Sequence, residues 1–179
     1  MLTIVVPATE SYDERTEQFI ETKEQKLTLE YSLVSVSKWE SKWNKPFLSK
    51  EQKTDEETRD FIRCMTITQN VDPMVYYALT ESNYNEIAEY INAPMTATWF
   101  AEDKKRPNRE IVTAEIIYYW MIALQIPWEA QKWHLNRLMT LIRVCNEKNK
   151  PPKKMGKRSI MSKNQALNAA RRQHLGSMG

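Results

Sequence analysis

The segment REIVTAEIIYYWMIALQ, residues 109–125, is the clearest helical signal in this chain of 179 residues. Its apolar residues recur so densely that they cover most of the circumference of an α-helix, which is typical of the centre of a helical domain. We therefore expect it to be buried on most sides. Pro127 separates it from residues 128–148, which we predict to form a second long helix packed on the first as an antiparallel hairpin. The apolar side of that second helix would carry Leu135, Leu138, Met139, Ile142 and Cys145.

Four segments upstream also have helical spacing or helix start signals. Residues 32–43 place Leu33, Val36, Trp39, Glu40 and Trp43 on one stripe. Residues 54–57, Thr-Asp-Glu-Glu, form a capping box that predicts a helix start. Asp72-Pro73 is a cap followed by a proline at the first helical position, which predicts a shorter helix. Residues 84–91 indicate one more helix, which ends before Pro94.

The N-terminal region has strand signals instead. Residues 2–6 are β-branched and apolar, and residues 26–31 alternate apolar and polar side chains, so we expect the two segments to pair. Residues 9–25 between them are polar and acidic, which favours a loop or a peripheral helix. Residues 95–100 fit either a strand or a buried helical turn, and residues 102–109 predict an exposed connection.

Glycine is scarce, with Gly156, Gly176 and Gly179 as the three in the chain. A glycine-rich phosphate loop and a dinucleotide-binding fingerprint both need several glycines, so both are excluded. Hairpin-rich folds are disfavoured for the same reason. The predicted fold class is mainly α: a helical domain with a small N-terminal β element and a basic, partly disordered C-terminal arm.

The net charge of +3 hides an uneven distribution. Residues 1–147 contain 17 basic and 23 acidic side chains, whereas residues 148–179 contain nine basic ones and no acidic one. We predict a helical body over residues 1–147 and a Pro-containing linker with a basic arm over residues 148–179. Within the arm, residues 162–174 would form a marginal helix that orders on a partner. The arm's charge could serve solubility, could contact the chain's own acidic surface or a partner's, or could bind nucleic acid.

Targeting and membrane signals are missing from the sequence. The first residues lack the pattern of a signal peptide, and the longest uncharged stretch, residues 116–128, has 13 residues, against the roughly 20 that span a bilayer. Cys64 and Cys145 have no zinc-site spacing, so a reduced cytosolic environment is the simplest interpretation, with one disulfide left open. We expect a soluble protein without a membrane segment.

No residue pattern predicts an enzyme. His134 has no neighbouring nucleophile, so we interpret it as structural. Cys64 follows Arg63, but adjacent helical residues point in different directions. The acidic residues 55–60 are explained by the positive end of a helix. We therefore expect no catalytic residue, no metal site and no cofactor.

Five segments carry a resemblance to a known group. They are SLVSVSKWESKW at 32–43, PMTATWF at 94–100, IIYYWM at 116–121, WHLNRL at 133–138 and ALNAARR at 166–172. Together they resemble small proteins encoded in the tail modules of long-tailed bacteriophages, in particular the tail assembly chaperones. The likeness spans nearly the whole chain and includes no catalytic motif.

The resemblance implies a non-enzymatic protein that binds the phage tape measure protein, prevents its hydrophobic helices from aggregating and helps recruit tail tube protein. Such a protein acts in the host cell cytoplasm during assembly and leaves the finished tail. Two alternatives stay open: a structural virion protein of the tail or connector, and a basic-tailed nucleic-acid-binding regulator, although nucleic acid is the less favoured partner. Whether the protein forms a homo-oligomer also stays open.

Partner-binding residues are predicted on the body and on the arm. Tryptophans are mostly core residues, but exposed ones are effective anchors for a protein partner. The predicted anchors on the body are Trp39, Trp43, Trp120 and Trp133. The predicted auxiliary site on the arm consists of Lys150, Lys153, Lys154, Lys157, Arg158, Arg171 and Arg172.

Overall fold

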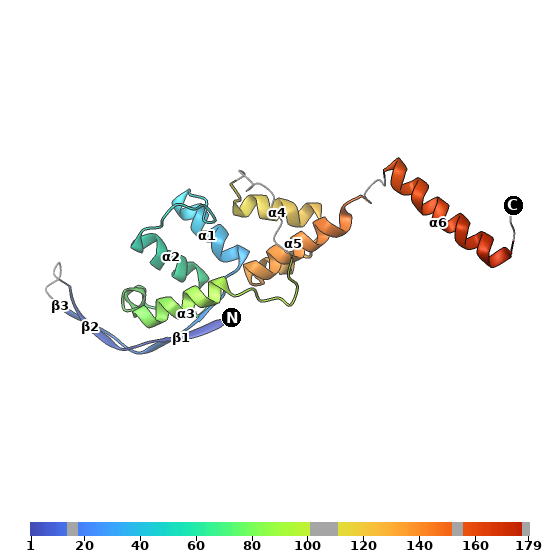
Figure 1. Ribbon diagram of the computed structural model, residues 1–179. Helices are drawn as coiled ribbons and strands as arrows, with labels where there is room; N and C mark the ends of the chain where they lie inside the picture. Colours follow the sequence, from blue (N-terminus) through green and yellow to red (C-terminus); the bar gives the residue numbers. More distant parts are fainter. Residues whose placement is uncertain (14–17, 101–110, 152–155, 177–179) are drawn as a thin grey trace. The chain divides into compact units, whose positions relative to one another are not determined.

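The computed structural model describes residues 1–13, 18–100, 111–151 and 156–176. The fold is mainly α with a small N-terminal β element, as expected from the sequence (Figure 1). Its α-helices are α1 (Leu33–Trp43), α2 (Asp55–Met65), α3 (Glu81–Asn92), α4 (Ala114–Ala123), α5 (Leu135–Asn149) and α6 (Lys157–Leu175). Two 3-10 helices are η1 (Pro73–Tyr77) and η2 (Trp128–Lys132). The chain divides into two compact units between Glu147 and Lys148, where the charge composition changes.

The N-terminal strands form a long two-stranded ribbon. Strand β1 (Leu2–Val6) pairs antiparallel with β4 (Gln25–Leu29), which confirms the predicted pairing. The loop or helix predicted for residues 9–25 is wrong, because β2 (Thr9–Asp13) and β3 (Gln18–Thr22) pair as well. Val6 pairs with Gln25 and Thr9 with Thr22, so the second ladder continues the register of the first. Two strands already held in register favour further pairing even where the side chains are polar.

The base of the ribbon is part of the core of the first unit. Ile4, Val6, Leu27 and Leu29 are buried on its inner face. The free edge of β4 is covered by the chain that follows α2, since the Ile67 amide donates to the Thr28 carbonyl over 2.8 Å. Helix α3 packs on β1, and the side-chain amide of Asn83 donates to the Val5 carbonyl over 3.1 Å.

Helices α1 and α2 begin at the predicted residues. Ser32 and Thr54 are their N-caps, and both form complete capping boxes. The two helices pack together through Trp39, which is 1% exposed and donates its indole N–H to the Glu57 carbonyl over 2.9 Å. Phe47 and Phe61 extend this aromatic contact as a stacked pair. Local start signals and the apolar stripe therefore predict this part of the fold correctly.

His134 has the structural role that the sequence indicated. Its imidazole is buried between the rings of Tyr31 and Tyr90, and Nε2 donates to the Tyr90 carbonyl over 3.0 Å. Burial lowers the pKa of His134, which favours the neutral ring. The backbone at His134 also pairs with Ser32, so this residue fixes the chain before α5 against the start of α1.

The predicted central helix is shorter and less buried than expected. Helix α4 begins at Ala114, and Ala114, Ile117 and Met121 form its buried face. Tyr119 and Ile122 on the opposite face are 66% and 67% exposed. Burial on most sides is therefore wrong for α4, which packs against α1 on one side.

The predicted hairpin of two long helices is also wrong. The chain after Pro127 forms the short η2, and α5 begins only at Leu135. The backbone pairing of His134 with Ser32 requires an extended conformation there, which interrupts any helix that begins at Trp128.

Two connecting segments were predicted between α3 and α4. Residues 95–100 form neither a strand nor a buried turn, because they are irregular and Trp99 is 81% exposed. The connection predicted at residues 102–109 lies outside the described residues.

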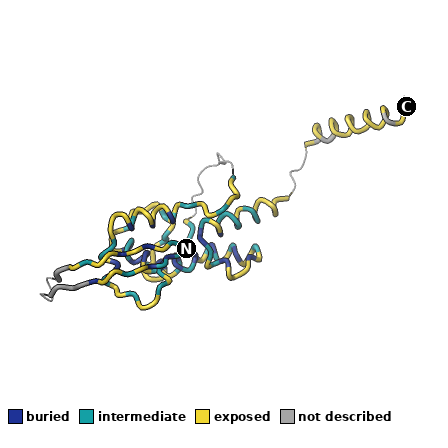
Figure 2. The backbone as a smooth tube through the Cα atoms, turned by 90° about the horizontal axis from the view of Figure 1, so that it is seen from below, coloured by how far each residue is buried: buried dark blue, intermediate teal, exposed yellow. Residues whose placement is uncertain are grey.

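The second unit contains α6, which is longer than the predicted helix over residues 162–174. It begins after Gly156 and ends before Gly176, whose φ of 61° is the left-handed conformation typical of the residue that caps a helix end. All its described side chains are exposed, including Met161 and Leu167 (Figure 2).

Glu40 connects α1 to two other segments. Its carboxylate is buried, with Oε1 accepting from the Phe47 amide and Oε2 from the Ala114 amide, each over 2.7 Å. Thr113 at the N-cap of α4 makes no side-chain capping bond, so Glu40 supplies the cap from another helix. A carboxylate is also favourable at the positive end of the helix.

Replacing Glu40 by Ala should therefore destabilise the fold. Glu40→Ala leaves two amides without their acceptor, and we expect the free energy of unfolding to fall by roughly 3 kcal/mol. Urea denaturation followed by circular dichroism measures the loss. Glu89→Ala, on the exposed face of α3, is the matched control and should change stability by less than about 0.5 kcal/mol. Equal losses in the two variants would contradict the capping role of Glu40.

Candidate functional site

A network of charged residues on α2 involves Asp60. Its carboxylate is buried, with Oδ1 accepting from Lys42 Nζ and Arg63 Nε, each over 2.8 Å, and Oδ2 accepting from Trp43 Nε1 over 2.9 Å. Burial raises the pKa of Asp60, but these hydrogen bonds outweigh it and the pKa is lowered. The positive end of α2 explains the position of Glu57, which belongs to the capping box of this helix. It does not fully explain Asp60, because two partners of Asp60, Lys42 and Trp43, lie on α1.

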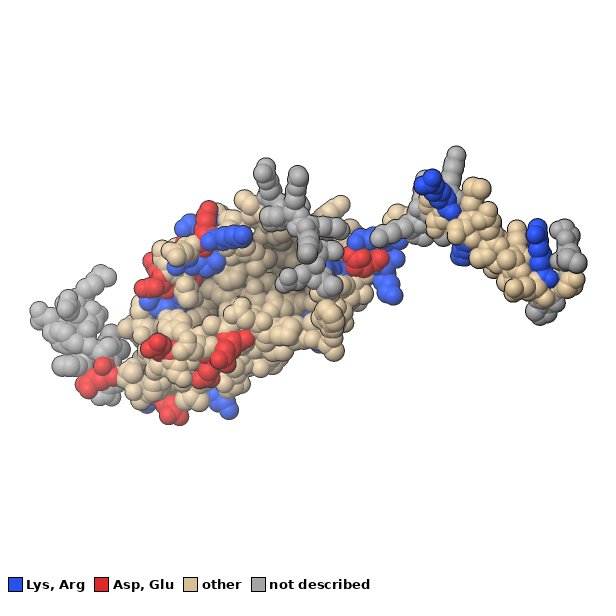
Figure 3. All heavy atoms as spheres, in the orientation of Figure 1, with Lys and Arg blue, Asp and Glu red and all other residues tan. Residues whose placement is uncertain are grey.

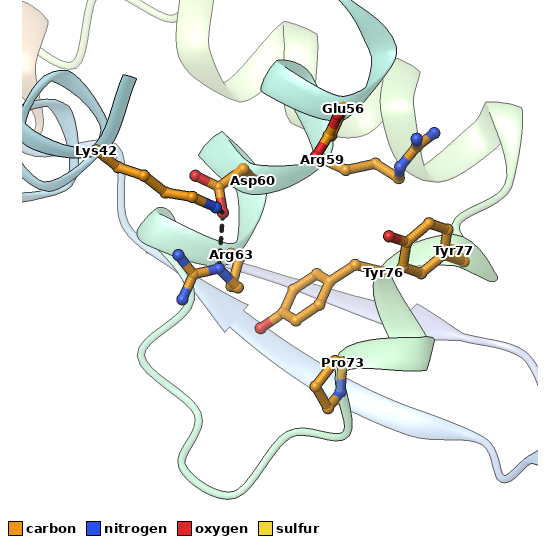
Figure 4. Close-up of a pocket in the computed structure, with 8 residues that line it drawn as sticks. All are labelled: Lys42, Glu56, Arg59, Asp60, Arg63, Pro73, Tyr76 and Tyr77. Carbon is orange, nitrogen blue, oxygen red and sulfur yellow. Dashed lines mark hydrogen bonds and ion pairs between the residues drawn. The ribbon is translucent and has the colours of Figure 1, made fainter. Parts of the chain in front are cut away.

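A hollow of about 160 Å³ adjoins this network (Figure 4). Its lining comes from Lys42 of α1, from Glu56, Arg59, Asp60 and Arg63 of α2, and from Pro73, Tyr76 and Tyr77 of η1. This lining contains no Cys, His or Ser, so it holds no Ser–His or Cys–His pair. Cationic and aromatic groups dominate it.

An apolar surface lies on the outer face of α4. Tyr119 and Ile122 are exposed there, and Trp128 of η2, 52% exposed, stacks on Tyr118 with ring centroids 5.2 Å apart. Residues three and four apart on a helix are neighbours, so Ile122 adjoins both Tyr118 and Tyr119. We call Tyr118, Tyr119, Ile122 and Trp128 the α4 surface. Single exposed apolar residues are common, but a contiguous group of this kind is typical of a protein-binding site.

Trp39 is wrong as an anchor, because it is fully buried and its indole N–H is bonded inside the fold. Trp43 is half-buried and bonded to Asp60. Trp120 and Trp133 are half-buried against the core, and the guanidinium of Arg137 lies 4.4 Å from the ring of Trp133. An anchor role for Trp43, Trp120 and Trp133 stays a prediction.

The exposed tryptophans are Trp99 and Trp128, which sequence reasoning did not select. Trp128 follows Pro127 directly, and a proline at that point allows a short turn in place of a long helix. Such a turn brings the indole onto Tyr118 of α4. Pro127 is therefore the sequence signal that could have predicted the turn at Trp128.

The basic arm is described in part. Lys153 and Lys154 lie outside the described residues, and Lys157 begins α6 with a side chain that is not described. Lys150 directly follows α5. Arg158, Arg171 and Arg172 are exposed on α6, which carries no acidic residue (Figure 3). Arg158 and Arg171 are about 20 Å apart along the helix, so the positive charges are spread along α6 and do not form one compact site.

Three further features bear on function: the Cys64 thiol, metal-binding side chains and membrane-spanning helices. Burial raises the pKa of the Cys64 thiol, and the charge of Asp60 raises it further, which is the opposite of what a nucleophile needs. Among the described residues, no group of three His, Cys, Asp or Glu side chains has the geometry of a metal site. No helix in the same residues has the length and apolar character needed to cross a membrane.

The lowered pKa of Asp60 predicts a pH-dependent contribution to stability. At pH 7 we expect Asp60→Asn to lower the free energy of unfolding by roughly 2–4 kcal/mol, because three donors lose a charged acceptor. Below the unfolded pKa of about 3.9, the unfolded wild type binds a proton that the native state does not, so this contribution is lost as pH falls further. Urea denaturation at pH 7, 5 and 3 should show the difference between wild type and variant shrinking at pH 3. A difference independent of pH would contradict the ionised network.

Comparison with protein-family models, curated proteins and solved structures finds no match to this chain. The described structure offers the apolar α4 surface, the cationic hollow beside Asp60 and the basic helix α6.

Proposed function

We propose that this protein is a non-enzymatic assembly chaperone that holds an apolar helical segment of a partner on the α4 surface. The observation that carries the proposal is the exposed group formed by Tyr119, Ile122 and Trp128 beside Tyr118. A chain that only needed a stable core would gain solubility from polar residues at these positions. Aromatic and aliphatic side chains along a helix are instead the surface on which an amphipathic helix docks.

The size of the surface favours a reversible contact. Burying one large apolar side chain contributes roughly 1.5–3 kcal/mol, and association itself costs several kcal/mol. Three such side chains therefore support a modest affinity. This is appropriate for a protein that must release its partner when assembly is complete.

The resemblance to phage tail assembly chaperones identifies the partner in this proposal. The apolar segment belongs to the tape measure protein, and tail tube protein is the second partner. The basic arm supplies the second contact, since Arg158, Arg171 and Arg172 are exposed on a helix without acidic residues. The protein would act in the host cell cytoplasm during phage assembly.

Changing the α4 surface should weaken binding to the tape measure protein while the fold is kept. Ile122→Ser is expected to reduce the amount of co-expressed tape measure protein that co-purifies by about tenfold, because a large apolar side chain no longer becomes buried. Pull-down through a tag on the chaperone measures it. Ile67→Ser, an exposed isoleucine after α2, is the matched control and should retain binding. Equal retention by both variants would argue against the α4 surface.

A structural virion protein is the second candidate, because the long exposed helix α6 could equally lie against a neighbouring subunit. Mass spectrometry of mature particles separates the two. A chaperone is absent from the particle, whereas a tail or connector component is present at a fixed ratio to the other subunits.

The contact made by the arm should depend on salt, in contrast with that of the α4 surface. In the double variant Arg171→Gln and Arg172→Gln, we expect weaker binding to tail tube protein at 50 mM salt and little difference at 500 mM, because exposed charges are screened. Fluorescence anisotropy at the two salt concentrations measures it. Salt-dependent binding to duplex DNA that the double variant loses, without binding to tail tube protein, would favour the nucleic-acid regulator instead.

A further inference from the structure

A histidine caps the first turn of α5. Helix α5 begins at Leu135, and the carbonyl of the preceding His134 accepts the first hydrogen bond of the helix, from the Leu138 amide over 3.1 Å. His134 is therefore the N-cap residue. Its ring nitrogen Nδ1 accepts from the Asn136 amide over 3.3 Å. In most helices a serine, threonine, aspartate or asparagine side chain supplies this bond.

The cap fixes the charge state and the tautomer of the ring. A backbone N–H only donates, so Nδ1 has a free lone pair and the proton is on Nε2, which donates to the Tyr90 carbonyl over 3.0 Å. Both nitrogens of a ring that is 7% exposed are thus in use. Protonation would place a second N–H opposite the Asn136 amide and a positive charge at the positive end of α5. The cap exists only while His134 is neutral.

The same turn of α5 holds the end of α3. The side-chain amide of Asn136 donates to the carbonyls of Ile91 and Ala93, each over 2.8 Å. Together with the bond from His134 to Tyr90, these bonds supply donors to three carbonyls at the end of α3. The last carbonyls of a helix have no partner inside it and need such donors. A change in the first turn of α5 therefore reaches the end of α3.

The surroundings of His134 keep it neutral at pH 7. The titratable and charged groups around the ring are the N-terminal ammonium, Glu30, Tyr31, Tyr90 and, one turn later on α5, Arg137. Burial has the largest effect on the pKa of His134 and lowers it. The hydrogen bond to the Tyr90 carbonyl and the charge of Glu30 raise this pKa only in part. The N-terminal ammonium, 3.2 Å from a Glu30 oxygen, lowers it further.

We infer that His134 is a proton-sensitive N-cap, which holds the first turn of α5 against the end of α3 at neutral pH and releases it in acid. Protonation removes the acceptor of the Asn136 amide, so the turn that carries the Asn136 side chain loses its cap. A histidine in the unfolded chain has a pKa of about 6.5, so below that pH the unfolded state binds a proton before the native state does, and native stability falls. This device goes beyond the proposed chaperone function, because it needs no partner protein.

NMR spectroscopy of the full-length wild type between pH 7.5 and 4.5 tests the cap. The ring ¹⁵N resonances of His134 report the protonation of Nδ1, and the backbone resonance of Asn136 reports the hydrogen bond. We expect both to titrate with one midpoint, below the value of about 6.5 for an unperturbed histidine. Exchange of the Asn136 amide, corrected for its intrinsic pH dependence, should rise roughly tenfold across the transition, because the cap is lost and an unfavourable charge is added.

His134→Asn separates the cap from other effects of pH. Asparagine is a preferred N-cap residue and its side chain does not titrate, so the corrected exchange of Asn136 should be independent of pH in this variant. The matched control is His174→Gln, which removes the other histidine of the chain and should keep the wild-type response. Ile122→Ser should also keep it, so the cap and the chaperone proposal can fail independently.

Three results would overturn the inference. The first is an Asn136 resonance that stays unchanged while His134 titrates. The second is a ring that remains neutral over the whole pH range, and the third is a wild-type response that persists in His134→Asn. The first two are measured on the wild type, so the test is decisive even where His134→Asn fails to fold.

Discussion

The buried carboxylate of Glu40 is the interaction on which the arrangement of the first unit depends. It accepts from the amides of Phe47 and Ala114, which belong to two segments separated by more than sixty residues of chain. Backbone amides buried without an acceptor are costly, so these two bonds fix both segments on α1. The position of α4 against α1 follows from them. Once Ala114, Ile117 and Met121 face α1, the opposite face with Tyr119 and Ile122 is necessarily presented outward.

Features governed by neighbouring residues could be predicted from the sequence. The caps at Ser32 and Thr54 join residues three positions apart. Strands β1 and β4 each carry a local strand signal, although their pairing joins residues as distant as Leu2 and Leu29. Features whose residues carry no local signal could not. Glu40 appeared only as one position in an apolar stripe, because its partner Ala114 is 74 residues away. The β2–β3 ladder was missed because its polar sequence has no strand signal, and only the register set by β1 and β4 favours it.

The candidate site shows the same division. Aromatic content pointed to tryptophans near α4, but exposure decides which of them are available to a partner. Trp39 is in the core and Trp128 is outside it, although both occur in segments with helical spacing. The periodicity of α4 indicated apolar residues on nearly every side, and periodicity of that kind does not distinguish burial inside one chain from burial in a complex. Only the packing of α4 on α1 separates the two faces.

The two exposed features of the chain differ in their physics, and this bears on how the protein would work. Contact through Tyr119, Ile122 and Trp128 gains free energy by removing apolar area from water, which salt weakens little. Contact through α6 depends on exposed charges and is screened within about 10 Å at 0.1 M salt. Under the proposed function, one partner would therefore be held or released without the other. A protein that must carry an apolar helix while it recruits a second subunit, and then leave both, needs that independence more than it needs high affinity at either surface.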